Sequence, residues 1–300
     1  MGYGEKPAEM DGGGFDGERA AEMVAEMREI FRSGKTRSLE WRAAQLKALV
    51  RMIEEKEADI MAALDADLAK PQLESYLHEI SLAKSSCTFA LKELKRWMKP
   101  EKVPASIATF PSTAQIVSEP LGVVLIISAW NYPFLLSLDP VIGAIAAGNA
   151  VVLKPSEVAP ATSSLFARIL PDYMDNSCMR VVEGSIPETT ALLEQKWDKI
   201  FYTGNGKVGR IVMAAAAKHL TPVTLELGGK SPVVVDSNVD VKVDSLKRIL
   251  EKFYGKDASE SKDLSRIVNA NHFKRLTSLL DDEKVSGKIV HGGQRDVKRL

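Results

Sequence analysis

The chain has 300 residues, of which 45% are hydrophobic, enough to bury a substantial core in one large domain or two smaller ones. Forty lysines and arginines balance forty aspartates and glutamates, which removes the electrostatic case for nucleic acid or an anionic membrane surface as a partner. The longest apolar run, Leu121–Trp130, is far shorter than the ~20 residues of a membrane-spanning helix, so we expect no membrane segment.

The N-terminal part is predicted to be a flexible tail followed by helices. Residues 1–17 are rich in glycine and acid and have neither the apolar stretch of a signal peptide nor the Arg/Ser bias of a transit peptide, so we expect a cytoplasmic protein. Apolar residues then recur at helical spacing, for example Leu46, Leu49 and Ile53. The pattern predicts helices through the first hundred residues and a connector or hairpin over Ile107–Glu119.

From Gly122 onward, apolar β-branched runs alternate with helical segments. The predicted strands are Val123–Ser128, Ala150–Lys154, Met179–Val182, Lys199–Thr203 and Val223–Leu227. The predicted helices are Leu135–Ala147, Ala159–Tyr173, Ile186–Gln195 and Val208–Ala217, the third opened by a capping box of Ser185 with Glu188. Continuous apolar runs are typical of strands buried on both faces. The alternation therefore predicts an α/β fold with a doubly wound parallel sheet.

Fewer strands are predicted after Pro232. Val233–Val235 and Lys288–His291 are candidate strands, whereas Val241–Tyr254 and Leu264–Asp281 have helical spacing. We therefore expect residues 233–300 to form only part of a second α/β domain, following a first unit over residues 18–232. The sequence ends soon after Gly292-Gly293, with no further strand or helix to complete the domain, and this predicts a truncated chain.

Lys154 and Glu157 are candidate ligand-binding residues at the end of a predicted strand. Ligands bind at the carboxyl edge of open α/β sheets, where a cation can meet a ribose or phosphate and a carboxylate can accept from ribose hydroxyls. The alternative is a solvated charged turn. Gly204–Gly209 follows the predicted strand Lys199–Thr203 and opens a helix, as a phosphate-contacting turn does, although its glycine spacing is not GxGxxG. The alternative there is an ordinary tight turn.

Two further strand ends carry groups suited to catalysis. Glu226 ends a strand and is followed by Gly228 and Gly229, which suits a mobile general base; the alternative is a pair with Lys230. Asn131 follows the first strand of the sheet, where its amide can donate to a developing oxyanion; the alternative is an Asn turn before Pro133.

Together, these motifs resemble the aldehyde dehydrogenase superfamily in their order, spacing and strand-end positions. The matching segments are Ser128–Pro133, Gly148–Glu157, Phe201–Gly209 and Leu225–Pro232, of which the last is the most specific. Phe253–Gly255, Ser265–Asn269, His272-Phe273 and Arg275-Leu276 are similar to the class 3 branch in a plant-type version. The resemblance runs from about Ala20 to the C-terminus and implies a Rossmann-like cofactor domain after the N-terminal helices.

The resemblance also implies roles for these residues in oxidising aldehydes to carboxylic acids with NAD(P)+. Asn131 would help to stabilise the oxyanion, and Glu226 would be the general base. In the family, a cysteine thiolate attacks the aldehyde, hydride passes to the nicotinamide, and glutamate-activated water hydrolyses the thioester. The implied cofactor contacts are Lys154 and Glu157 at the adenosine ribose, Gly204, Asn205 and Gly209 near the pyrophosphate, and Trp130, Thr203, Leu227 and Gly228.

The chain departs from the family at the nucleophile. The family has a cysteine a few dozen residues after the glutamate, in a Gly-Gln-x-Cys context, but no cysteine follows Cys178 here. Asp236–Asp240 runs almost directly into Val241–Tyr254, which in the family lies well downstream of that cysteine. An internal deletion, from exon skipping or a gene-model error, is the simplest interpretation. The family's remaining catalytic-domain and oligomerisation elements are also missing.

The two cysteines present are predicted to be structural. Cys87 lies at helical spacing from Ala83 and Leu91, which indicates core packing, and Cys178 sits in a loop before a strand. Neither has a CxxC or histidine companion, so no structural metal site is expected. The four histidines, His78, His219, His272 and His291, are scattered and indicate no metal or Cys-His pattern.

These observations predict an aldehyde dehydrogenase family oxidoreductase that lacks its nucleophile and is inactive or severely impaired. The alternatives are a non-catalytic isoform that binds NAD(P) or pairs with a full-length subunit, and an unstable truncated product. NAD is slightly favoured over NADP because Glu157 would repel a 2′-phosphate, although Lys154 could offset that effect. Family members are commonly homodimers, and the missing C-terminal element puts a dimer in doubt here.

Overall fold

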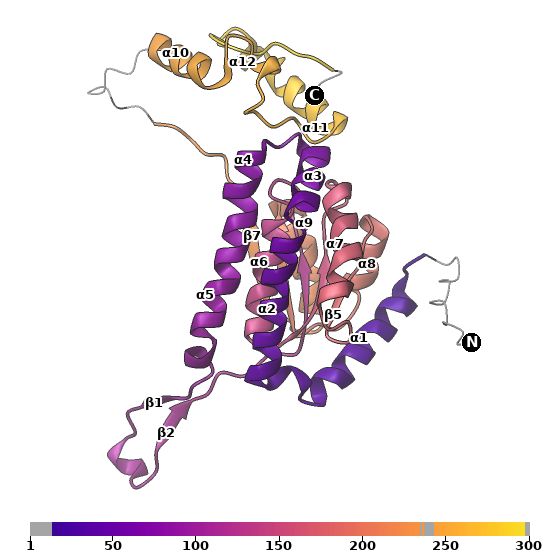
Figure 1. The fold of residues 1–300 in the computed structure, drawn as a ribbon, viewed down its shortest axis with the longest axis vertical. Helices are drawn as coiled ribbons and strands as arrows, with labels where there is room; N and C mark the ends of the chain where they lie inside the picture. Colours follow the sequence, from indigo (N-terminus) through magenta and orange to yellow (C-terminus); the bar gives the residue numbers. More distant parts are fainter. Residues whose placement is uncertain (1–13, 235, 237–242, 298–300) are drawn as a thin grey trace.

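The computed structural model describes residues 14–234, 236 and 243–297 (Figure 1). Most of the predicted N-terminal tail lies outside the described residues, as do Val235 and most of the junction between Asp236 and Val243.

The N-terminal helices are confirmed. Their bounds are α1 (Gly17–Arg32), α2 (Leu39–Glu55), α3 (Glu57–Leu68), α4 (Gln72–Ser75) and α5 (Ser81–Trp97). Asp16 caps α1 by accepting from the Arg19 N–H, and Ser38 caps α2 by accepting from the Trp41 N–H. A short 3₁₀ turn, η1 (Lys35–Arg37), joins α1 to α2, and a π-helical turn, η2 (Tyr76–Ile80), joins α4 to α5.

A two-stranded antiparallel ribbon follows α5, where a connector or hairpin was predicted. Strands β1 (Glu101–Val103) and β2 (Ala114–Ile116) pair antiparallel around the 3₁₀ turn η3 (Ile107–Thr109). The ribbon projects from the body of the molecule at the bottom of Figure 1. Ile107 and Phe110 at its tip are exposed.

The predicted doubly wound parallel sheet is confirmed. Its strands are β3 (Val123–Ile127), β4 (Ala150–Lys154), β5 (Met179–Val181), β6 (Lys199–Gly204) and β7 (Val223–Leu227), in the order β5-β4-β3-β6-β7 with every pair parallel. The helices between them are α6 (Leu135–Ala146), α7 (Pro160–Tyr173), α8 (Ile186–Leu193) and α9 (Gly206–Ala217). The strand order reverses between β3 and β6, where such sheets open a binding crevice at the carboxyl edge.

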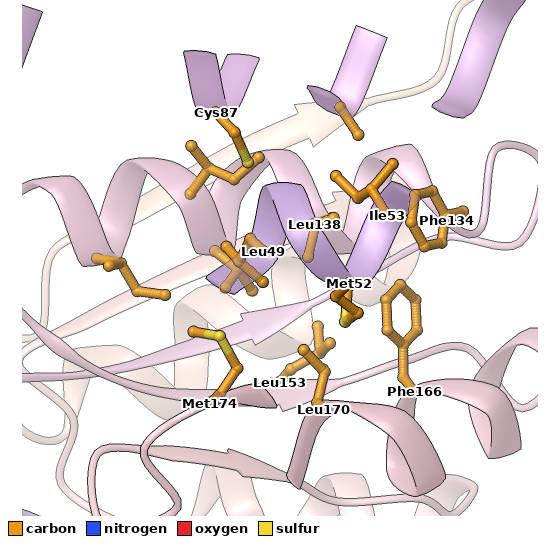
Figure 2. Close-up of a cluster of buried hydrophobic side chains, with 14 of the residues drawn as sticks. Leu49, Met52, Ile53, Cys87, Phe134, Leu138, Leu153, Phe166, Leu170 and Met174 are labelled. Carbon is orange, nitrogen blue, oxygen red and sulfur yellow. The ribbon is translucent and has the colours of Figure 1, made fainter. Parts of the chain in front are cut away.

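Both faces of the sheet are covered. Along β3, Val124 and Ile126 point into the core beneath α2, α5, α6 and α7, whereas Val123, Leu125 and Ile127 point into the core beneath α1, α8 and α9. Figure 2 shows the first core, in which the rings of Phe134 and Phe166 stack with centroids 5.3 Å apart. Burying each such ring contributes roughly 1.5–3 kcal/mol, so these layers hold the strand ends in fixed positions.

The predictions for the C-terminal part are partly wrong. Three helices are found there, α10 (Val243–Tyr254), α11 (Ala270–Leu280) and α12 (Glu283–Ser286), with the 3₁₀ turn η4 (Ala258–Glu260) between the first two. Neither Val233–Val234 nor Lys288–His291 is a strand. Val233 and Val234 are exposed and have no neighbouring strand to take their backbone hydrogen bonds. No strand follows β7 among the described residues.

The predicted helix over Leu264–Asp281 is shorter than expected. It begins at Ala270 because the Asn269 side chain accepts from the His272 N–H and caps it. The preceding residues form an irregular segment that runs past the end of α3, where the Arg266 N–H donates to the Leu68 carbonyl at 2.7 Å. A cap and a tertiary contact therefore override the helical spacing of Leu264–Val268.

Candidate functional site

The carboxyl edge of the sheet gathers the predicted site residues. In the parallel register, Ile127 of β3 lies between Lys154 of β4 and Tyr202 of β6, and Thr203 of β6 lies opposite Glu226 of β7. The loop carrying Trp130 and Asn131 leaves β3 at this same edge. Because side chains alternate between the two faces of a sheet, Lys154 shares the face of Ile127 and Tyr202, whereas Thr203 and Glu226, one position further along, lie on the other face of the same edge.

Lys154 and Glu157 form an ion pair at the end of β4. The Lys154 Nζ lies 2.6 Å from the Glu157 Oε2, and the lysine side chain is 3% exposed whereas that of the glutamate is 43% exposed. The lysine head therefore reaches the edge from inside the protein, and the carboxylate faces solvent. This geometry agrees with a ligand that takes hydrogen bonds from an ammonium and gives hydroxyl hydrogen bonds to a carboxylate.

In the turn between β6 and α9 and at the start of that helix, neighbouring side chains lie close to the backbone of two glycines. Asn205 caps α9, because its Oδ1 accepts from the Val208 N–H at 3.0 Å. A Cβ on Gly204 would collide with the Tyr202 hydroxyl, which itself donates to the Asn205 carbonyl. A Cβ on Gly209 would lie 3.3 Å from Leu227.

The start of α9 has the properties of an anion site. No acidic residue lies in the first turn of this helix, so the partial positive charge of its N-terminus is not neutralised locally. The Gly228 N–H donates to the Gly204 carbonyl, which brings the β7 end beside this turn. A Cβ on either Gly228 or Gly229 would meet no atom within 4 Å, so open space lies next to the helix start.

Glu226 and Leu227 stand at the exposed end of β7. No ion pair links Glu226 to Lys230 among the described residues, so the alternative of a structural pair is not supported. The carboxylate is accessible to solvent, as a general base that works on water must be.

The Asn131 loop is held by contacts that the sequence did not indicate. The Asn131 side chain is exposed, while its carbonyl accepts from the Lys70 Nζ at 3.4 Å. The Trp130 ring lies 4.7 Å, centroid to centroid, from the ring of His272 in α11. Burial, together with the charge of Arg275, lowers the pKa of His272, which favours the neutral ring against Trp130. Sequence analysis placed His272 among scattered histidines and missed this contact.

Sequence analysis also missed the buried ion pair of Lys70 and Glu79, whose side chains are 2% and 0% exposed. A signal for it does exist: Glu79 stands four residues before Ala83, on the buried stripe that continues with Cys87, Ala90 and Leu94. An acid on such a stripe requires a partner, but the sequence does not say which residue provides it.

Neither cysteine belongs to the site, as predicted. Cys87 lies in the core of Figure 2, where burial, with the nearby Asp139, raises its pKa to about 12. Cys178 precedes β5 at the amino edge of the sheet, opposite to the candidate site, and burial raises its pKa as well. Both groups remain thiols at neutral pH, and a thiol is a poor nucleophile.

The described part of the chain contains no cluster of three or more histidine, cysteine, aspartate or glutamate side chains that could hold a metal ion. Among the same residues, no helix is both long and apolar enough to cross a membrane.

Comparisons with known proteins point to one protein family. The model of the aldehyde dehydrogenase family matches residues 13–255. Aldehyde dehydrogenase family 3 member H1 of Arabidopsis thaliana is 56% identical over 95% of this chain and 66% of its own length. The dimeric NADP-preferring aldehyde dehydrogenase of Rattus norvegicus is 45% identical over 92% of this chain and 68% of its own length. The substrate-bound structure of Staphylococcus aureus AldH matches with a TM-score of 0.89 at 37% identity, over 93% of this chain and 68% of that one.

The chain is shorter than these relatives, and part of the difference lies within the aligned stretch. It spans 66% of the length of the plant relative, and the alignment between them covers 321 residues, more than the 300 residues of this chain. The plant relative therefore has residues, within the aligned stretch, that have no counterpart here.

Proposed function

The chain belongs to the aldehyde dehydrogenase family, and from that premise we propose that its carboxyl sheet edge binds NAD(P)+ next to groups that serve aldehyde oxidation. The observation that carries this proposal is that Lys154 of β4, Thr203 of β6 and Glu226 of β7 all stand at the carboxyl edge of one parallel sheet, with the N-terminus of α9 at the same edge.

The residues at this edge fit the two polar parts of a dinucleotide. Lys154 and Glu157 together offer a donor and an acceptor to a ribose diol, and the first turn of α9 offers backbone N–H groups to a pyrophosphate. Gly204, Asn205 and Gly209 shape that turn. Trp130, Thr203, Leu227 and Gly228 are proposed to complete the contacts. When bound, the cofactor supplies a nicotinamide that accepts hydride.

Two side chains are proposed to act on the aldehyde. Asn131 donates its amide N–H to the oxygen that gains negative charge as the carbonyl is attacked. Where a thiolate supplied from outside the described residues forms the acyl intermediate, Glu226 would accept a proton from the water that displaces that thiolate.

We further propose that this chain does not complete the reaction alone. Covalent aldehyde oxidation needs a thiolate near the nicotinamide, whereas Cys87 is buried in the hydrophobic core, Cys178 is buried at the amino edge of the sheet, and burial raises the pKa of both. The residues of the plant relative that have no counterpart here are consistent with a missing nucleophile segment between Glu226 and α10. An internal deletion remains our proposal for that segment.

The proposal is tested by following cofactor binding and turnover in the same purified protein. We expect saturable binding of NAD+ or NADP+ that raises the unfolding temperature in proportion to the logarithm of cofactor concentration above the dissociation constant. We expect no aldehyde-dependent formation of reduced cofactor. The preference for NAD+ stays a prediction, to be decided by titrating both cofactors, as do the aldehyde specificity and a cytoplasmic location.

A further inference from the structure

Glu79 holds the start of α6 from inside the protein. Its Oε2 accepts from the N–H groups of Phe134 and Leu135 at 2.8 and 3.1 Å, and its Oε1 accepts from the Lys70 Nζ at 2.6 Å. The first N–H groups of a helix have no partner within the helix, so a carboxylate at this point both satisfies them and complements the helix dipole.

Lys70 holds the other side of the same loop. Besides its ion pair, its Nζ contacts the Asn131 carbonyl at 3.4 Å and lies 3.9 Å from the centroid of the Tyr132 ring. An ammonium over an aromatic face is attracted by the ring, most strongly where water is excluded. The contacts of the pair therefore converge on residues 131–135, the segment that leads from β3 into α6.

Each member of the pair lies at an uncommon backbone turn: Lys70 follows the left-handed residue that ends α3, and Glu79 lies in a π-helical turn. Ala69, next to Lys70, has the left-handed conformation (φ 46°, ψ 41°), which is costly for a residue with a Cβ. Glu79 lies in the π-helical turn η2, where the Ser81 N–H bonds to the Tyr76 carbonyl five residues earlier. Such turns are rare and frequently occur at functional sites.

Stability alone gives a poor account of this pair. Removing two charges from water costs free energy that their attraction only partly repays, and apolar residues of similar size often stabilise a core equally well. Apart from the ion pair itself, the polar side-chain contacts of Lys70 and Glu79 go to the backbone of residues 131–135, and this arrangement is better explained by the need to fix that loop in one position.

We infer that Lys70 and Glu79 are positioning residues that fix the backbone of residues 131–135 and thereby set the position of the Asn131 amide at the carboxyl edge of the sheet. The importance of that position rests on the proposed role of Asn131, whereas the fixing of the loop rests only on the contacts above.

The test uses the full chain with Lys70→Met and Glu79→Gln combined. Removing both charges together leaves no unpaired buried charge, and glutamine keeps an oxygen that can accept from a backbone N–H. The matched control combines Lys84→Met with Glu54→Gln, because that pair has the same 2.6 Å separation but is exposed. The readout is the ¹⁵N–¹H spectrum of the four tryptophan indoles, with the Trp130 signal assigned by Trp130→Phe.

We expect the Trp130 signal to shift or broaden in the buried-pair variant, while those of Trp41 and Trp197 stay in place and the control variant matches the wild type. We also expect the amides of Phe134 and Leu135 to exchange with solvent about tenfold faster or more, as the weakening of one hydrogen bond produces. An unchanged Trp130 signal with unchanged exchange would overturn the inference, as would an equal change at all four tryptophans.

The outcome is separable from the proposed function. Cofactor binding by the wild-type chain tests that function without reference to Lys70 or Glu79. A wild-type chain that binds no NAD(P)+, but whose Trp130 signal still responds to loss of the pair, would contradict the proposed function and leave the fixing of the loop in place.

Discussion

The Lys154 ammonium and the Glu157 carboxylate lie 2.6 Å apart, yet the first side chain is 3% exposed and the second 43% exposed. The pair is therefore open to solvent on the carboxylate side only. A ligand that approaches the carboxyl edge can use both charges without breaking a fully buried ion pair, which is the arrangement expected at a ribose site.

Replacing Lys154 by methionine should weaken cofactor binding with little loss of fold stability. The charged hydrogen bond to the ribose contributes about 1.5–3 kcal/mol, so the dissociation constant for NAD+ should rise roughly tenfold to a hundredfold. The unpaired Glu157 remains solvated, so the unfolding temperature should change little. Calorimetric titration measures the affinity, and Lys218→Met at the far end of α9 is the control. Equal affinities in wild type and Lys154→Met would refute the ribose role.

Replacing Glu157 by glutamine should shift cofactor preference toward NADP+. A carboxylate about 4 Å from a phosphate charge repels it by about 1 kcal/mol even at the dielectric constant of bulk water, which is at least a roughly fivefold effect on affinity. The ratio of the NADP+ and NAD+ dissociation constants, measured at one ionic strength, should therefore fall in Glu157→Gln. If that ratio does not move, Glu157 does not face the adenosine ribose.

Replacing Gly204 by alanine should damage both the turn and the cofactor site. The new Cβ would overlap the Tyr202 hydroxyl, and moving that ring releases its hydrogen bond to the Asn205 carbonyl. Overpacking of this kind costs about 1–3 kcal/mol of unfolding free energy. Gly143→Ala is the matched control, since a Cβ there meets nothing within 4 Å. The unfolding free energies of both variants are measured with denaturant. Equal values for Gly204→Ala and Gly143→Ala would contradict the predicted overlap with Tyr202.

The two thiols should be unreactive in the folded protein. Burial raises the pKa of Cys87 to about 12 and also raises that of Cys178, which disfavours the reactive thiolate form of both residues at pH 8. A thiol-specific disulfide reagent should therefore label no cysteine in the native state and both after unfolding in guanidinium. Rapid labelling of the folded chain would contradict the assignment of both residues to the core.

The same shift predicts a loss of stability at alkaline pH. Above pH 9, the unfolded state releases the Cys87 proton while the folded state keeps it, so the free energy of unfolding falls as pH rises from about 9 toward 12. The contribution of one such group approaches about 1.4 kcal/mol per pH unit. Cys87→Ala should therefore lose stability less steeply than wild type in urea unfolding between these pH values. If the unfolding free energies of wild type and Cys87→Ala depend on pH with the same slope, Cys87 is not shielded from solvent in the folded protein.

Strand positions were predictable because a strand buried on both faces has a continuous apolar pattern. Ala150–Lys154 and Val223–Leu227 form at the predicted residues, and the other sheet strands differ by one residue at an end. The pattern failed at Val233–Val234, where apolar residues have no neighbouring strand to pair with. Pairing is a long-range property that local sequence does not report.

The site was predictable only in part, for a related reason. Motif residues that follow strands had to meet at the carboxyl edge, because parallel strands bring all such ends together. The partners that hold them could not be read in the same way. Lys70 and Glu79 meet through two unusual backbone turns, and His272 reaches Trp130 from α11, far away in the chain. None of these contacts leaves a local periodic signal.

The central claim is that the chain has a cofactor site without a usable nucleophile. It is tested most directly by incubating the purified 300-residue chain with NAD+ or NADP+ and measuring cofactor binding by calorimetry, followed by aldehyde-dependent absorbance of the reduced cofactor in the same sample. The account predicts saturable binding of at least one cofactor and no reduced cofactor above the aldehyde-free control. Sustained reduction that requires both aldehyde and this chain would contradict it.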